Sequence, residues 1–130
     1  MIFRCTYYWY IPAAILAVGI AVVSLMENPH IPKEIQLSDK TMHALMYALL
    51  AISLAVAIFC NRHAAWRAAL WTIVATTVYG GVMELLQAWC TRTRSGDWLD
   101  VAADLIGAVT GFVLVWIGWL WYRHTHTTQR

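Results

Sequence analysis

Four long runs without charged side chains constrain this chain more than any other feature of its sequence. They cover residues 5–26, 41–61, 68–91 and 105–122, and only Glu84 interrupts them. About 20 consecutive apolar residues are enough for a helix to cross a hydrocarbon core of roughly 30 Å. The fourth run is predicted to begin earlier, near Leu99, with acidic residues in its first turns. The predicted spans are therefore residues 5–26, 41–61, 68–91 and 99–122.

The composition supports a membrane protein rather than a soluble one. Charged residues make up 12% of the chain and hydrophobic residues 61%, whereas soluble domains are about 25% charged. The net charge of +2 is not gathered into a basic stripe, so no nucleic-acid partner is expected. Short connections favour an all-α membrane protein with four transmembrane helices in an up-and-down bundle. We interpret residues 1–130 as a single integral membrane domain whose first partner is the lipid bilayer.

The distribution of Lys and Arg at the span ends predicts the orientation. If both termini are cytoplasmic, five of these residues lie on the cytoplasmic side and four on the outer side. We therefore expect a multi-pass protein with cytoplasmic termini. The first run is too long for a signal peptide and is interpreted as a retained helix. His124 and His126 follow the last span and are interpreted as part of a solvated tail.

Polar residues recur at helical spacing on three of the predicted spans. Residues three or four positions apart lie on one face of a helix, and helix direction alternates along the chain, so the three faces converge at one membrane level near the outer side. The set comprises Asp39, His43 and Tyr47 on the second span, Gly80, Glu84 and Gln87 on the third, and Asp100, Asp104, Gly107 and Gly111 on the fourth.

Glu84 and Asp104 are the most informative members of this set. Each lies more than one helical turn inside its span, at about 1.5 Å per residue. An ionised acidic side chain facing lipid costs about 2.5 to 3.5 kcal/mol on insertion scales, so both should face the bundle interior. Gly80 and the pair Gly107 and Gly111 remove side-chain bulk and are predicted to permit close helix packing.

Simpler structural explanations remain open for the other polar residues. Asp39 can cap the second helix, and Asp100 can complement the positive N-terminus of the fourth. One interhelical hydrogen bond is enough to satisfy either His43 or Tyr47. Arg94 can be a solvated loop charge.

These residues form spaced motifs in a fixed order: Asp39-Lys40-x-x-His43-x-x-x-Tyr47-x-x-Leu50, then Gly80-x-x-x-Glu84-x-x-Gln87, then Arg94-Ser95-Gly96-Asp97-Trp98-Leu99-Asp100-x-x-x-Asp104-x-x-Gly107-x-x-x-Gly111. Over residues 39–111 the chain resembles the VanZ-like family of small bacterial membrane proteins. The family usually has Asn where Asp104 stands. The first span carries no motif and shares the resemblance only through its position.

The resemblance implies a cell-envelope protein of the bacterial plasma membrane. The family is named after a protein that is encoded with glycopeptide-resistance genes and confers low-level teicoplanin resistance. It implies no established reaction, so the chemistry has to be argued from the polar residues themselves.

We favour a non-catalytic protein that binds an envelope lipid or lipid-linked precursor at this polar set. Arg94 would meet a phosphate or carboxylate at the outer headgroup level. Asp39 would pair with His43, and Asp100 with Glu84. No nucleophile motif is present, and no cofactor-binding motif either.

The alternative is a metal-dependent hydrolase or transferase that acts on a lipid-linked envelope precursor. His43 would be its general acid or base, and Glu84, Asp100 and Asp104 would hold a divalent cation on oxygen ligands. A proton pathway is a third possibility, but the polar set reaches only the outer half of the helices.

Overall fold

The computed structural model describes residues 7–26, 39–60, 64–92 and 97–127. A short 3-10 helix, η1 (Tyr7–Tyr10), leads into α1 (Ile11–Leu25). Three longer helices follow: α2 (Asp39–Cys60), α3 (Ala65–Cys90) and α4 (Trp98–Thr127). No strand occurs among the described residues. Each of the four helical segments, with η1 counted as part of the first, is long and apolar enough to cross a membrane.

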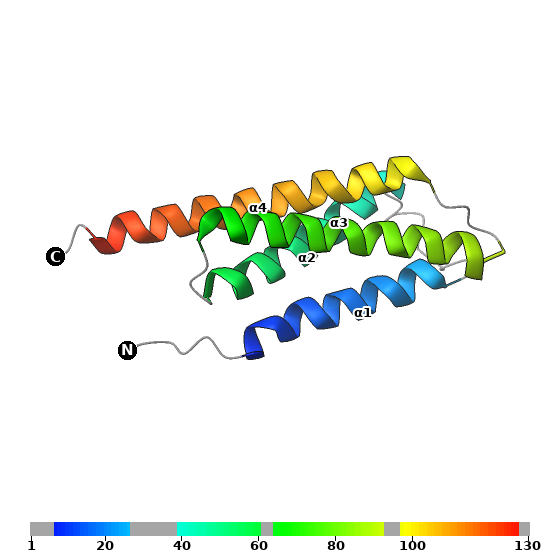
Figure 1. Ribbon diagram of the computed structural model, residues 1–130, viewed down its shortest axis with the longest axis horizontal. Helices are drawn as coiled ribbons and strands as arrows, with labels where there is room; N and C mark the ends of the chain where they lie inside the picture. The colour runs from blue at the N-terminus through cyan, green and yellow to red at the C-terminus, as the bar shows by residue number, and fades with distance from the viewer. Residues whose placement is uncertain (1–6, 27–38, 61–63, 93–96, 128–130) are drawn as a thin grey trace, which may run out of the picture.

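The helices run alternately up and down along one long axis (Figure 1). The start of α1 and the end of α4 therefore lie at the same end of the bundle (Figure 1). The predicted all-α fold of four membrane-spanning helices is confirmed.

Helix ends depart from the prediction by a few residues. Pro12 stands in the first turn of α1, where its missing N–H costs no hydrogen bond, and the four residues before this helix form the 3-10 turn. Helix α4 continues to Thr127 rather than ending at residue 122, so His124 and His126, which were predicted to lie in a solvated tail, are exposed residues in the last turns of this helix. No Gly or Pro interrupts these residues, and the rings of Tyr122 and His126 meet edge to face with centroids 4.3 Å apart.

The closest helix packing is that of α4 against α2. A Cβ placed on Gly107 would lie 3.0 Å from the carbonyl carbon of Ala44, and one on Gly111 would lie 3.0 Å from the Cβ of Ala51. Small residues on both helices thus bring the two backbones together, as the Gly-x-x-x-Gly spacing predicted. Helix α1 packs on the other side of the bundle, against α2 and α3.

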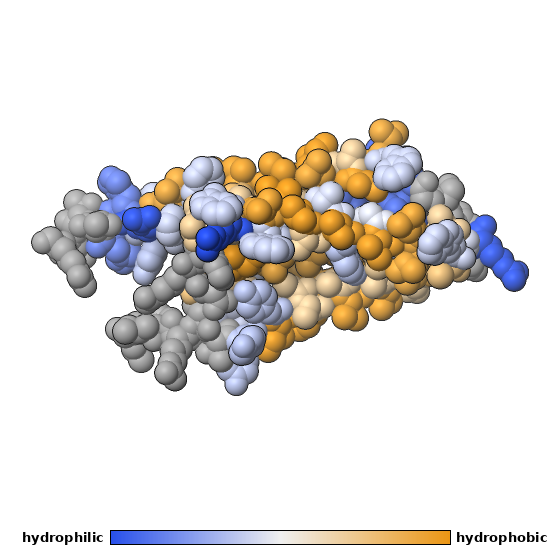
Figure 2. Space-filling view, viewed as in Figure 1, coloured by the Kyte–Doolittle hydropathy of each residue, from blue (hydrophilic) through white to orange (hydrophobic). Residues whose placement is uncertain are grey.

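On the face of the bundle seen in Figure 2, a belt of apolar side chains covers the middle, and hydrophilic residues gather towards the ends. Large exposed side chains of this belt include Val78, Leu114 and Ile117. Inside the bundle, near the chain termini, Phe59 and Phe112 stack with centroids 5.9 Å apart in an apolar core. The interior at the other end of the bundle is polar.

Candidate functional site

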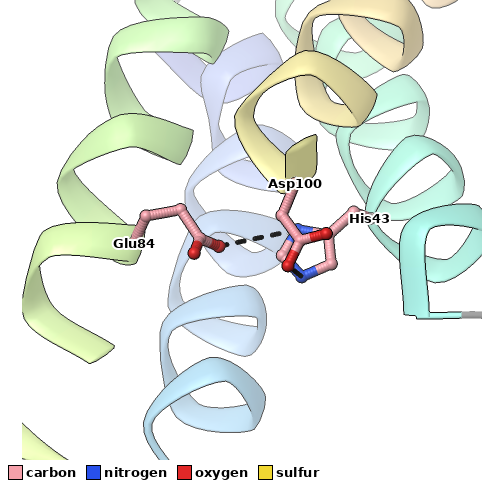
Figure 3. A group of neighbouring side chains, drawn as sticks. All are labelled: His43, Glu84 and Asp100. Atoms are coloured by element: carbon pink, nitrogen blue, oxygen red, sulfur yellow. Dashed lines mark ion pairs between the residues drawn. The ribbon is translucent and has the colours of Figure 1, made fainter. Parts of the chain in front are cut away.

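Four ionisable side chains from three helices meet at the end of the bundle where α2 and α4 begin. They are all buried, and three of them are drawn in Figure 3. We call this group the polar cluster, and it consists of His43 from α2, Glu84 from α3, and Asp100 and Asp104 from α4. Because charged groups are almost never buried without a partner, their contacts decide what the cluster can do.

The shortest contact in the polar cluster joins His43 to Asp104. His43 Nδ1 lies 2.9 Å from Asp104 Oδ1, and Asp104 is completely buried. Gly80 faces Asp104 and leaves room for its carboxylate, because a Cβ on Gly80 would lie 3.0 Å from Asp104 Cγ. On its other side His43 stacks on Tyr47, with parallel rings whose centroids are 6.3 Å apart. The imidazole is thus held in a fixed position.

Glu84 connects the polar cluster to the start of α4. Its Oε2 accepts a hydrogen bond of 2.9 Å from the backbone N–H of Asp97. Its Oε1 is buried, has no hydrogen-bond partner among the described residues, and lies 4.0 Å from His43 Nδ1. One carboxylate oxygen is therefore positioned by the protein while the other is available to a further group.

Lys40 lies at the rim of the polar cluster and neutralises part of its negative charge. Its Nζ donates to Asp97 Oδ2 at 3.1 Å and to Asp100 Oδ1 at 3.2 Å. The Asp97 carboxylate also accepts a hydrogen bond from the backbone N–H of Leu99, and this bond, followed by the one from Lys40, lowers the pKa of Asp97 below its usual range. Asp97 is thus ionised at neutral pH and caps the first turn of α4.

Three members of the polar cluster have the geometry of a metal-binding group. One ligand atom from each of His43, Glu84 and Asp100 lies within 4.8 Å of the other two. The sequence had suggested Asp104 as a ligand together with Glu84 and Asp100. The structure instead places Asp104 against His43 Nδ1, where it orients the imidazole.

The predicted pairings within the polar cluster were partly wrong. Asp100 was expected to pair with Glu84, but its Oδ1 accepts from Lys40 and Glu84 accepts from the Asp97 backbone. His43 bonds to Asp104. The Asp39 side chain, its expected partner, lies outside the described residues, as does the whole of Arg94.

Gln87 lies one turn beyond Glu84 and binds a different helix. Its Nε2 donates a 3.0 Å hydrogen bond to the carbonyl oxygen of Ser24, in the last turn of α1. The last carbonyls of a helix have no partner within it, so Gln87 caps α1 from outside. Tyr79, which sequence reasoning missed, makes a similar contact through its hydroxyl to the Ala17 carbonyl. Tyr79 and Gln87 are eight residues apart on one face of α3, and this spacing was a usable signal.

A cavity of about 340 Å³ lies between α3 and α4 beside the polar cluster. Its walls are almost entirely apolar, and two carboxylate residues, Glu84 and Asp97, take part in its lining. We call it the α3/α4 groove, and its main apolar side chains are Val78, Val82, Leu85, Trp98 and Val101.

The family model described as VanZ/LLP1 matches residues 7–121, which include α1, α2, α3, most of α4 and the whole polar cluster. No curated protein and no solved structure matches the chain.

Proposed function

The chain belongs to the VanZ/LLP1 family, and we propose that it is an envelope protein of the bacterial plasma membrane that binds a lipid in the α3/α4 groove. The bound molecule is an envelope lipid or a lipid-linked precursor, since both combine a long apolar chain with a polar headgroup. The observation that carries this proposal is the position of Glu84, which belongs both to the buried polar cluster and to the wall of an apolar groove.

The groove is suited to an apolar chain rather than to a water-soluble ligand. Val78, Val82 and Leu85 line it from a helix that crosses the apolar belt, and all three are exposed on the bundle surface. In a bilayer this surface contacts lipid, so a lipid chain enters the groove without leaving an apolar environment. Trp98, at the start of α4, stands where amphipathic aromatic rings meet headgroups.

The charges near the groove favour a headgroup that donates hydrogen bonds. Four carboxylates surround this region, whereas Lys40 and His43 are its basic side chains among the described residues; the carboxylates are those of Glu84, Asp97, Asp100 and Asp104. An amine or hydroxyl in the headgroup would meet the carboxylate of Asp97, which takes part in the groove lining. The role of Arg94 as a contact for phosphate stays a prediction.

Lipid binding at this position would link the protein to the glycopeptide resistance that the family resemblance implies. With both termini in the cytoplasm, the polar cluster lies in the outer leaflet, where glycopeptides such as teicoplanin meet lipid-linked precursors. We expect a fluorescent protein fused after Arg123 to be bright and alkaline phosphatase fused there to be inactive. The opposite pair of results would place the cluster in the inner leaflet and would contradict this link.

Lipid occupancy of the groove can be measured directly. The protein is purified in mild detergent, and the lipids that remain bound are identified by native mass spectrometry, which separates phospholipids from polyprenyl-linked precursors. Val82→Trp should fill the groove and abolish retention. Val74→Trp is the matched control, because Val74 lies two turns earlier on the same face of α3 and is not part of the groove lining. Equal lipid retention in wild type and both variants would contradict the proposal.

A second candidate function is hydrolysis or group transfer on a lipid-linked precursor. The observation that favours it is the 2.9 Å contact of His43 with Asp104, because a carboxylate that orients an imidazole is an arrangement used for proton transfer. Divalent-dependent turnover of a lipid-linked phosphate, lost in a folded Glu84→Gln variant, would establish this activity. Absence of turnover with both phospholipid and polyprenyl substrates would exclude it and leave the binding function.

A further inference from the structure

We propose that His43, Glu84 and Asp100 bind one divalent transition-metal ion of the Zn²⁺ type between α2, α3 and α4 (Figure 3). The proposed metal site shares Glu84 with the proposed lipid site, but it depends on contacts inside the bundle rather than on the apolar lining of the α3/α4 groove. It rests on the spacing of the three side chains, on the orientation of the imidazole, and on a buried carboxylate oxygen that lacks a partner.

The spacing of the three ligand atoms is close to that of a metal site. Two atoms bound to one tetrahedral Zn²⁺ at about 2.0 to 2.2 Å lie about 3.3 to 3.6 Å apart. His43 Nε2 and Asp100 Oδ2 are 4.0 Å apart, and one ligand atom of each of the three residues lies within 4.8 Å of the others. The three side chains would have to move closer together to bind a single ion.

The hydrogen bonds around the group leave its metal-facing atoms available. When the imidazole proton is on Nδ1, His43 donates it to Asp104 Oδ1. The lone pair is then on Nε2, on the side of the ring near Asp100 Oδ2. Asp100 Oδ1 accepts a hydrogen bond from Lys40, and Asp100 Oδ2 remains available to another partner. A carboxylate on the far nitrogen of a ligating histidine is the usual outer contact of protein metal sites, and Asp104 is in that position.

Glu84 supplies the independent sign that a ligand belongs here. Glu84 is 5% exposed, and its Oε1 has no hydrogen-bond donor among the described residues. A buried acceptor without a partner costs about 1 to 3 kcal/mol, and more when it is charged. A cation bound by Oε1 would remove this cost and would balance the excess of carboxylates over His43 and Lys40.

The donor set indicates which class of ion would bind. Mg²⁺ and Ca²⁺ prefer sites built from oxygen alone, and Ca²⁺ takes six to eight oxygens. One imidazole with two carboxylates suits Zn²⁺ or a neighbouring first-row ion. Three protein ligands leave a fourth position of a tetrahedral ion open, as in catalytic rather than structural zinc sites.

The test is metal binding by the purified, tag-free protein after removal of metal with a chelator. Isothermal titration with ZnCl₂ should show one ion per chain, and CoCl₂ should give the visible absorption of a tetrahedral Co²⁺ complex. His43→Gln, Glu84→Gln and Asp100→Asn should each weaken Zn²⁺ binding at least tenfold. Asp104→Asn should weaken it about 10- to 100-fold, as loss of an outer contact does.

Two control variants separate this site from surface binding. Cys90→Ser removes an exposed thiol, a Zn²⁺ ligand that is not in the group, so Zn²⁺ affinity should be unchanged. His126→Gln tests the exposed histidine near the end of α4 and should also have no effect. Wild type that binds no Zn²⁺, or binding that survives all three ligand substitutions, would overturn the proposal.

A measurement on the wild-type protein alone tests the proposal even if the variants fail to fold. Zn²⁺ should raise its melting temperature, and a chelator should reverse the increase, because a ligand that binds only the folded state stabilises it. A melting temperature that does not respond to Zn²⁺ would overturn the proposal even where no variant could be purified.

Discussion

Gly80 and Asp104 fit together across the interface of α3 and α4, and the absence of a side chain at the first position creates the space for the second. A Cβ on Gly80 would lie 3.0 Å from Asp104 Cγ and 3.1 Å from Asp104 Cβ. The Asp104 carboxylate cannot move away without giving up its contact with His43. The geometry of the polar cluster thus depends on a glycine that has no polar atom in its side chain.

We therefore expect Gly80→Ala to destabilise the folded protein and to weaken Zn²⁺ binding. Forcing a methyl group into a filled interior typically costs about 1 to 3 kcal/mol. Gly81→Ala is the control, because nothing lies within 4 Å of a Cβ at that position and a helical Gly→Ala change is otherwise favourable by about 0.5 to 1 kcal/mol. Melting temperatures in detergent measure both effects. Equal values for the two variants would show that the contact of Gly80 with Asp104 does not constrain the site.

Substitution of Gly107 or Gly111 by Ala should separate α4 from α2. The added methyl groups would meet the backbones of Ala44 and Ala48, which cannot rotate away as a side chain can. We expect a loss of at least about 1 to 3 kcal/mol for each variant. Gly118 faces open space on the same helix, so Gly118→Ala should not lower the melting temperature and should raise it slightly, since a helical Gly→Ala change is otherwise favourable. A similar loss in all three variants would show that the loss does not come from the interface of α4 with α2.

Gln87→Leu should loosen the end of α1 without unfolding the rest of the bundle. It removes the hydrogen bond to the Ser24 carbonyl, and a typical hydrogen bond contributes about 0.5 to 1.5 kcal/mol. Hydrogen exchange should increase in the last turn of α1 and remain unchanged in α4. Thr110→Val is the control, because the Thr110 hydroxyl bonds only to the Ile106 carbonyl of its own helix. Exchange that increases equally in both variants would contradict this role for Gln87.

Phe112→Ala should lower stability while leaving Zn²⁺ affinity intact, because Phe112 packs at the end of the bundle remote from the polar cluster. We expect a loss on the order of 2 kcal/mol, below the about 3 to 5 kcal/mol of soluble cores, since lipid is as apolar as the interior and mainly packing is lost. Val113→Ala, at a more exposed position, should change little. Loss of Zn²⁺ binding in a folded Phe112→Ala variant would show that the two ends of the bundle are coupled.

The membrane-spanning helices could be predicted from the sequence because one physical requirement dominates them. Charged groups are excluded from a hydrocarbon core, so runs without charge mark the spans to within a few residues. The end of α4 was predicted less well, since the residues beyond Tyr122 are all polar and such side chains are tolerated in a helix outside the hydrocarbon. The pattern of residues after Tyr122 does not distinguish a solvent-exposed helix from an irregular tail.

The polar cluster could be predicted in outline and not in its contacts. Helical periodicity and alternating direction determine which faces meet and at what depth, and the structure brings His43, Glu84 and Asp104 to the same level. Which side chains of the polar cluster pair with one another depends on the rotation of each helix about its axis and on shifts along that axis smaller than one turn. A change of one residue in register turns a side chain by about 100°, from 3.6 residues per turn, and spacing alone does not resolve it.

The attachment of α1 explains why the first helix carries no recognisable motif. The two hydrogen bonds described between α3 and α1 run from Tyr79 and Gln87 to the carbonyl oxygens of Ala17 and Ser24. Every helix presents such oxygens whatever its side chains are. Selection can therefore leave the sequence of α1 free to drift, provided that it stays apolar and helical, while the residues of α3 that hold it are retained. An alignment of relatives should show variation in the first helix and constancy at positions 79 and 87.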